Sequence, residues 1–152
     1  MTKEDELYSF PVLNQNITAL DWDFKGQLLA LAHRDKKFRI GDPRSATYTA
    51  EFAAHQSSQP SKIVWTGDNE LISVGNSKMN EHEICGYDTR KIEEPLFHKV
   101  LGQGKRSNAL YYVPDNNILF TVGRGESGIH FYEKVKEDPY LEKLMGWSTT
   151  TP

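Results

Sequence analysis

Three similar stretches of sequence follow one another along this chain of 152 residues. Each has an apolar strand with an aromatic residue, a short turn rich in Gly, Asp or Asn, a second strand that ends in small residues, and a third strand that ends on an acidic residue. The three acidic residues, Asp42, Asp88 and Glu133, stand 46 and 45 residues apart. A repeat of about 40 to 45 residues that carries about four strands is typical of one blade of a β-propeller.

The length of the chain limits how much of a propeller it can form. A closed ring needs about 4 to 8 blades, and the repeats account for about three. We therefore predict an all-β, incomplete propeller with blades at 17–59, 60–106 and 107–147. A tail at 1–16 is expected to include, at Leu7–Leu13, the outer strand of a preceding blade, and a second tail covers 148–152. Because the outermost blades lack a neighbour, we expect apolar faces and self-association.

Alternating apolar residues and regularly spaced turn residues locate the strands. The expected strands are 17–23, 28–32, 37–40 and 47–52 in the first blade, 63–65, 70–74, 83–87 and 97–101 in the second, and 109–113, 118–122, 129–135 and 141–146 in the third. No amphipathic helix of about ten or more residues stands out, which favours an all-β fold over βαβ units.

The composition indicates a folded protein and argues against several partners. An aromatic fraction of 11% and a charged fraction of 26% are typical of a globular domain. The net charge of -3 gives no global attraction to nucleic acid or anionic lipid. Cys85 alone cannot form an internal disulfide, which fits a reducing compartment. With no apolar segment typical of a signal peptide or a membrane span, we expect a cytoplasmic protein without membrane insertion.

Two short motifs are typical of chemical sites. Gly123–Gly128 matches the G-x-G-x-x-G pattern of dinucleotide-binding loops, but the residues that follow alternate like a strand, so a hairpin turn is the better interpretation. Asn80–Cys85 brings His, Glu and Cys together, yet zinc needs about four ligands and the chain offers no second cluster. We predict no catalysis, no cofactor and no metal. A nucleotide-using enzyme centred on Gly123–Gly128 is the alternative.

Three motifs lie next to the third strands of the repeats. A D-P-R at Asp42–Arg44 and a D-T-R at Asp88–Arg90 each stand at the end of a third strand, and the glycine-rich turn at Gly123–Gly128 precedes one. Together they resemble the later blades of coronins, WD-repeat propellers that bind actin filaments, and the similarity covers about 17–147. The resemblance implies a non-catalytic module that binds actin filaments or actin regulators at the cytoskeleton. The Trp-Asp pair that usually ends a blade is replaced by Gly41-Asp42, Tyr87-Asp88 and Tyr132-Glu133.

Coronins of the short type and of the tandem-propeller type both fit these residues. Because the tandem type is also linked to Golgi trafficking, an adaptor in protein assembly or vesicle trafficking without direct actin contact stays open as a second function. The family's early blades and its C-terminal coiled coil have no counterpart in this sequence.

Charged residues divide between the two faces of the predicted disc. The turns between second and third strands, and the connections between blades, share one face, and this face is net basic. A basic face suits an acidic partner such as an actin filament, while ordinary solvated turns are the alternative interpretation. The candidate partner-binding residues are Arg34, Lys36, Lys37, Lys78, Lys105, Arg106 and Arg124.

The acidic residues at repeat positions are expected to have structural roles. In WD repeats, an Asp in the turn that Asp35 occupies usually bonds to the backbone and to a His, and His33 and His55 are nearby candidates. Asp42, Asp88 and Glu133 mark the ends of the third strands.

Overall fold

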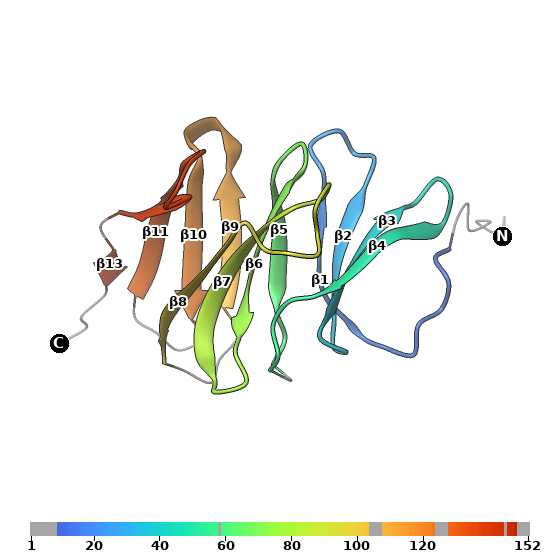
Figure 1. The fold of residues 1–152 in the computed structure, drawn as a ribbon, viewed down its shortest axis with the longest axis horizontal. Coiled ribbons are helices and arrows are strands. Elements are labelled where there is room, and N and C mark those ends of the chain that lie inside the picture. Colours follow the sequence, from blue (N-terminus) through green and yellow to red (C-terminus); the bar gives the residue numbers. More distant parts are fainter. Residues whose placement is uncertain (1–8, 58, 104–107, 124–127, 145, 149–152) are drawn as a thin grey trace, which may run out of the picture.

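The computed structural model describes residues 9–57, 59–103, 108–123, 128–144 and 146–148. They form three antiparallel sheets, which stand side by side along the molecule and which we call blades 1, 2 and 3 (Figure 1). Blade 1 contains β1 (Ile17–Trp22), β2 (Leu29–His33), β3 (Lys37–Asp42) and β4 (Thr47–Ala53); blade 2 contains β5 (Lys62–Gly67), β6 (Glu70–Asn76), β7 (Glu81–Asp88) and β8 (Phe97–Gln103); blade 3 contains β9 (Asn108–Val113), β10 (Ile118–Gly123), β11 (Gly128–Lys134), β12 (Leu141–Lys143) and β13 (Trp147–Ser148).

The fold class predicted from the repeats is confirmed. Each strand expected for the three blades is present, with its ends moved by no more than three residues. The last expected strand, 141–146, is shorter, and Ser148, which was assigned to the tail, belongs to β13. Both β12 and β13 pair with β11, and Gly146 lies between them. Glycine weakens a strand interior, which accounts for the interruption. The blade boundaries at residues 59 and 106 stay predictions.

Both faces of blade 2 are buried because alternate residues of its strands enter two different cores. On one side, Trp65, Leu71 and Tyr87 pack against Phe38 and Phe52 of blade 1. On the other side, Ile72, Val74 and Ile84 pack against Leu110, Leu119 and Tyr132 of blade 3. This arrangement explains why Leu71–Val74 is apolar almost without interruption.

The N-terminal segment differs from its prediction. In its described part, residues 9–13 form no strand. Instead, the ring of Phe10 lies over Gly41, where a Cβ atom would come within 2.6 Å of the ring, and it stacks on Tyr48 with centroids 5.2 Å apart. Pro11 has no N–H to donate to a sheet, which disfavours strand pairing here. The segment therefore covers the face of blade 1 that points away from blade 2.

The other end of the stack is more accessible. Tyr111 is 66% exposed, and Phe120 and Phe131, whose rings lie 5.0 Å apart, are only partly buried. These residues share the face of blade 3 that points away from blade 2. Within the described ranges, no helix is both long enough and apolar enough to span a membrane.

Candidate functional site

Three of the four predicted partner-binding residues that the structure describes lie on two turns at one edge of the sheets (Figure 1), and the fourth, Lys37, begins β3. Arg34 and Lys36 belong to the turn between β2 and β3, and Lys78 belongs to the equivalent turn between β6 and β7; all three are exposed. Lys105, Arg106 and Arg124 lie outside the described residues. The structure therefore brings part of the candidate set to one edge and leaves the rest unplaced.

These two turns have the same backbone geometry. Lys36 N–H donates to His33 O at 3.3 Å, and Asn80 N–H donates to Ser77 O at 3.0 Å. Lys36 and Asn80 both have left-handed backbone conformations, with φ values of 69° and 60°. Because the hydrogen bonds close the turns, the backbone that carries the cations is held in place.

The last predicted cation of this group, Lys37, has a different environment. Its ammonium group forms an ion pair with Glu51, and the guanidinium Nε of buried Arg39 donates to the other Glu51 oxygen at 2.8 Å. Lys37 and Arg39 alternate onto the same face of β3, so both reach the same carboxylate. The Lys37 charge is therefore partly compensated, which makes this side chain the weakest of the described candidates.

Asp35 has the predicted structural role but a different partner. Its Oδ1 accepts a hydrogen bond from Lys37 N–H at 3.1 Å, as a turn-closing Asp should. The predicted bond to a histidine is wrong, because Arg39 Nη2 donates to Asp35 Oδ2 at 2.7 Å instead. Burial of Asp35 opposes ionisation, but the hydrogen bonds from Arg39 outweigh it and hold the pKa of Asp35 below its usual range.

Asp42 and Asp88 build equivalent turns after β3 and β7. In each turn the carboxylate Oδ1 accepts from the backbone N–H two residues later, at 2.9 Å, from Arg44 and Arg90 respectively. The Arg90 guanidinium also donates to Asp88, which lowers the pKa of Asp88 to about 2. Glu133 occupies an exposed position of β11. The repeat aspartates thus fix the connection from the third strand to the fourth.

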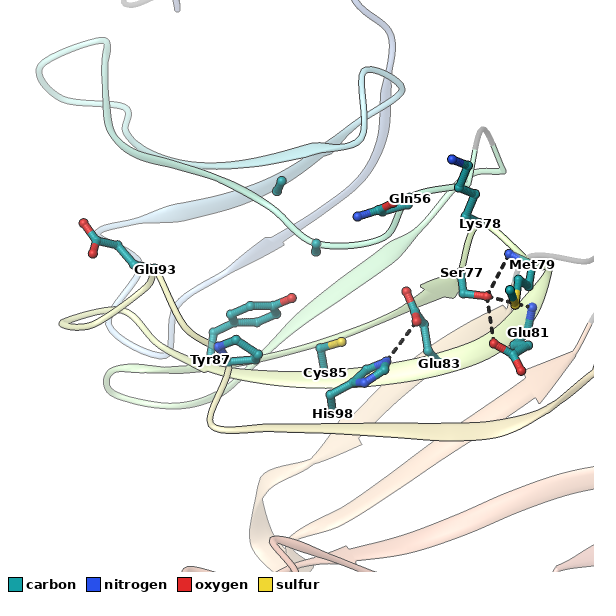
Figure 2. Close-up of a pocket in the computed structure, with 13 residues that line it drawn as sticks. Gln56, Ser77, Lys78, Met79, Glu81, Glu83, Cys85, Tyr87, Glu93 and His98 are labelled. Atoms are coloured by element: carbon teal, nitrogen blue, oxygen red, sulfur yellow. Dashed lines mark hydrogen bonds and ion pairs between the residues drawn. The ribbon is translucent and has the colours of Figure 1, made fainter.

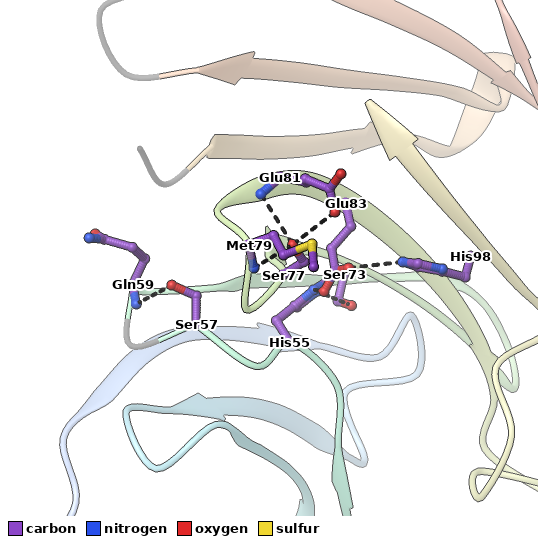
Figure 3. Close-up of polar contacts among 9 residues, drawn as sticks. All are labelled: His55, Ser57, Gln59, Ser73, Ser77, Met79, Glu81, Glu83 and His98. Carbon is purple, nitrogen blue, oxygen red and sulfur yellow. Dashed lines mark hydrogen bonds and ion pairs between the residues drawn. The ribbon is translucent and has the colours of Figure 1, made fainter. Parts of the chain in front are cut away.

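A buried polar network between blades 1 and 2 was not found by sequence reasoning (Figure 3). His55, in the connection between the blades, contacts Glu83 Oε1 through Nδ1 at 2.8 Å and Ser73 Oγ through Nε2 at 2.9 Å. The second Glu83 oxygen meets His98 Nε2 at 2.9 Å. Burial would raise the pKa of Glu83, but the hydrogen bonds with the two imidazoles lower it overall, so the carboxylate is anionic near neutral pH.

The partners of His55 are 18 and 28 positions away, and His98 is 15 positions from Glu83, so no local sequence motif indicates this network. The ring of His55 lies on Gly75, where a Cβ atom would come within 2.4 Å of it. Next to the network, burial raises the pKa of the Cys85 thiol to about 12, which leaves it protonated. A reactive thiolate is therefore not part of this site.

The structure bears on both motifs that were considered as chemical sites, the glycine-rich stretch and the candidate metal cluster. Gly128 begins β11, which pairs with β10 in an antiparallel manner, so a strand and not a helix follows the glycine-rich stretch. Within the part of the chain that the structure describes, no group of three His, Cys, Asp or Glu residues is arranged to hold a metal ion.

Antiparallel sheets of four consecutive strands, with β13 as an additional strand in blade 3, are stacked face to face and define the chain as part of a WD-repeat β-propeller. A family model described as the anaphase-promoting complex subunit 4 WD40 domain matches residues 2–69. Coronin-A of Dictyostelium discoideum is 34% identical over 136 residues, which is 90% of this chain and 30% of that protein. Over most of its length the chain is therefore similar to a coronin, in agreement with the resemblance seen in the sequence motifs.

Solved structures agree with this assignment. The WD40 domain of Toxoplasma gondii coronin superposes with a TM-score of 0.89 at 25% identity, covering 99% of this chain and 39% of that one. The chain thus spans about a third of the length of these coronins. A chain of the COPII outer coat vertex superposes with a TM-score of 0.73 at 15% identity, which shows a shared fold alone.

Proposed function

We propose that this chain is a non-catalytic WD-repeat binding module that contributes to the binding of actin filaments or actin regulators in the cytoplasm and at the cytoskeleton. The proposal rests on the similarity of the chain to coronin-A and to a coronin WD40 domain, because the resemblance to coronins implies actin as a partner. Because the chain spans about a third of the length of these relatives, its three blades would form only part of such an interface.

The observation that carries the proposal is the pattern of charge at the β2–β3 and β6–β7 turns. Arg34, Lys36 and Lys78 are exposed there. Of the carboxylates at these turns, Asp35 is paired with buried Arg39, and Glu81 accepts hydrogen bonds from Ser77 and Gln103. Among the described residues, the three exposed cations outnumber Glu81, so this edge is net positive. Such a patch attracts an acidic surface and is screened by salt.

Actin cosedimentation with the double variant Lys36→Glu/Lys78→Glu tests the proposal. We expect weaker pelleting with filaments than for the original chain, and a smaller loss of binding when salt is raised, because fewer charges remain to be screened. Lys25→Glu is the matched control: Lys25 forms an exposed ion pair with Asp68 at 3.3 Å on the opposite edge, and it should leave binding unchanged.

Two results would contradict the proposal. One is pelleting that is the same for the double variant and the original chain. The other is a pull-down that recovers coat or ubiquitin-ligase components without actin, which would favour the adaptor function instead.

A further inference from the structure

A groove of about 430 Å³ lies between the outer part of blade 1 and the β7–β8 face of blade 2 (Figure 2). Near the centre of the propeller the blades are tightly joined, since Trp65 N–H donates to Asp21 Oδ2 at 2.8 Å. The rings of Phe52 and Tyr87 close the space further out, with centroids 4.8 Å apart. Beyond them the groove is lined from this side by Ala53, Ala54 and Gln56, and the small alanines leave the wedge between the blades open.

The floor of this groove is apolar and contains one buried charge. Cys85 and Tyr87 are 4% and 3% exposed and line the groove together with Glu83. The Glu83 carboxylate is reached from outside through His98, whose side chain is 49% exposed. A cationic side chain of a ligand that took the place of His98 would meet an anion already desolvated by the protein, where a charge-assisted hydrogen bond is strong.

The rim adds further negative charge. Glu81 and Glu93 line the groove in addition to Glu83, whereas Lys78 contributes a positive charge to the same lining. Glu81 is held in place, because Gln103 Nε2 donates to its Oε1 at 3.2 Å. Met79, which is 79% exposed, lies at the same rim and offers a flexible apolar contact. The groove therefore has a net charge opposite to that of the exposed β2–β3 turn, which carries Arg34 and Lys36.

We propose that this groove binds an extended peptide segment of a partner protein, with an arginine or lysine side chain of the peptide directed at Glu83 and apolar neighbours over Cys85 and Tyr87. The volume lies within the range of about 300–1,000 Å³ typical of ligand pockets. Charge complementarity selects a basic peptide and disfavours an acidic one, so the occupant differs from the acidic partner expected at the turns. Arginine is favoured because its planar guanidinium can contact a carboxylate through two N–H groups.

Fluorescence polarisation with the full chain tests the groove. The probe is a fluorescein-labelled peptide of about seven residues with arginine at its centre and leucine and valine on either side, compared with the same peptide carrying glutamate at the centre. We expect the arginine peptide to bind at least about tenfold more tightly. Glu93→Lys should weaken its binding about fivefold, as reversal of one exposed charge allows. Glu142→Lys, which makes the same charge change at an exposed position of β12, should have no such effect.

Three outcomes would overturn the proposal. They are equal affinity for the arginine and glutamate peptides, equal effects of Glu93→Lys and Glu142→Lys, and no binding of either peptide at millimolar concentration. Because Glu93 and Glu142 are both exposed, neither variant removes a buried contact, and circular dichroism of the two variants should match the original chain.

Discussion

Replacing His55 with alanine removes the centre of the polar network between blades 1 and 2. The imidazole is buried, packs edge-on against Phe38 with centroids 5.9 Å apart, and contacts Glu83 and Ser73 through its two nitrogens. After the substitution, one oxygen of the Glu83 carboxylate and the Ser73 hydroxyl lose their contact with the imidazole. Water has little access to replace it, because Ser73 is 0% exposed.

The expected loss of stability follows from these contacts. A buried polar group that loses its hydrogen bond costs about 1–3 kcal/mol, and breaking a buried charged pair costs about 3–5 kcal/mol. The two ranges meet at about 3 kcal/mol, and we expect His55→Ala to lower the free energy of unfolding by about 3 kcal/mol. A domain is stable by only about 5–15 kcal/mol in total, so the effect is easily measured.

Urea unfolding followed by tryptophan fluorescence provides the measurement, since Trp65 is buried in the adjoining core. His98→Ala is the matched control, because it removes a histidine from the other oxygen of the same Glu83 carboxylate. The His98 side chain is 49% exposed, so water can replace it and the loss should stay within about 1 kcal/mol. Equal losses for the two variants, or a loss below about 1 kcal/mol for His55→Ala, would refute the reasoning.

The same network predicts a dependence on pH. The pKa of Glu83 lies below its ordinary value of 4.5 in the folded chain. A lowered pKa stabilises the fold fully above the unfolded-state pKa and loses this contribution as the pH falls through the folded-state pKa. Stability should therefore decline below about pH 4.5, and the decline should be shallower in His55→Ala, whose Glu83 lacks one of the hydrogen bonds that lower its pKa.

Three further predictions concern other parts of the chain. Phe10→Ala should lower stability by about 1–2 kcal/mol in urea unfolding, because a half-buried ring leaves blade 1, whereas Val12→Ala, at a 92% exposed position, should have no effect. Gly86→Ala should destabilise by about 1–3 kcal/mol, because its Cβ would lie 2.1 Å from the Phe97 ring; an unchanged urea midpoint would contradict this. The apolar face around Tyr111 should make the chain a dimer or larger in light scattering, and a stable monomer at micromolar concentration would exclude self-association.

The strands could be predicted because their signals are local. Alternation within about six residues and glycine or aspartate in the adjoining turns are enough to place β1 to β11, and the run Leu71–Val74 marks a strand buried on both faces. The N-terminal segment was misassigned because its apolar residues outweighed Pro11, which has no N–H for a sheet. Giving the proline more weight would have corrected that prediction.

The contacts of the site could not be predicted in the same way. Whether Asp35 meets a histidine or Arg39 depends on which side chains share a face of β3 and on how deeply each is buried. The contact between His55 and Glu83 joins two blades, so it exists only after their packing is known. The groove is likewise a product of how Ala53 and Ala54 approach the neighbouring sheet, and residue type alone does not indicate its shape.

Blade 2 is covered on both faces by its neighbours, and this central position determines which blades unfold locally first. Leu71, Val74 and Ile84 are 0% exposed, whereas blades 1 and 3 each have a single neighbouring sheet. Local opening begins where the fewest contacts must be broken. The amide protons of β6 and β7 should thus be the last to exchange with deuterium, after the flanking blades have frayed from the outside inward.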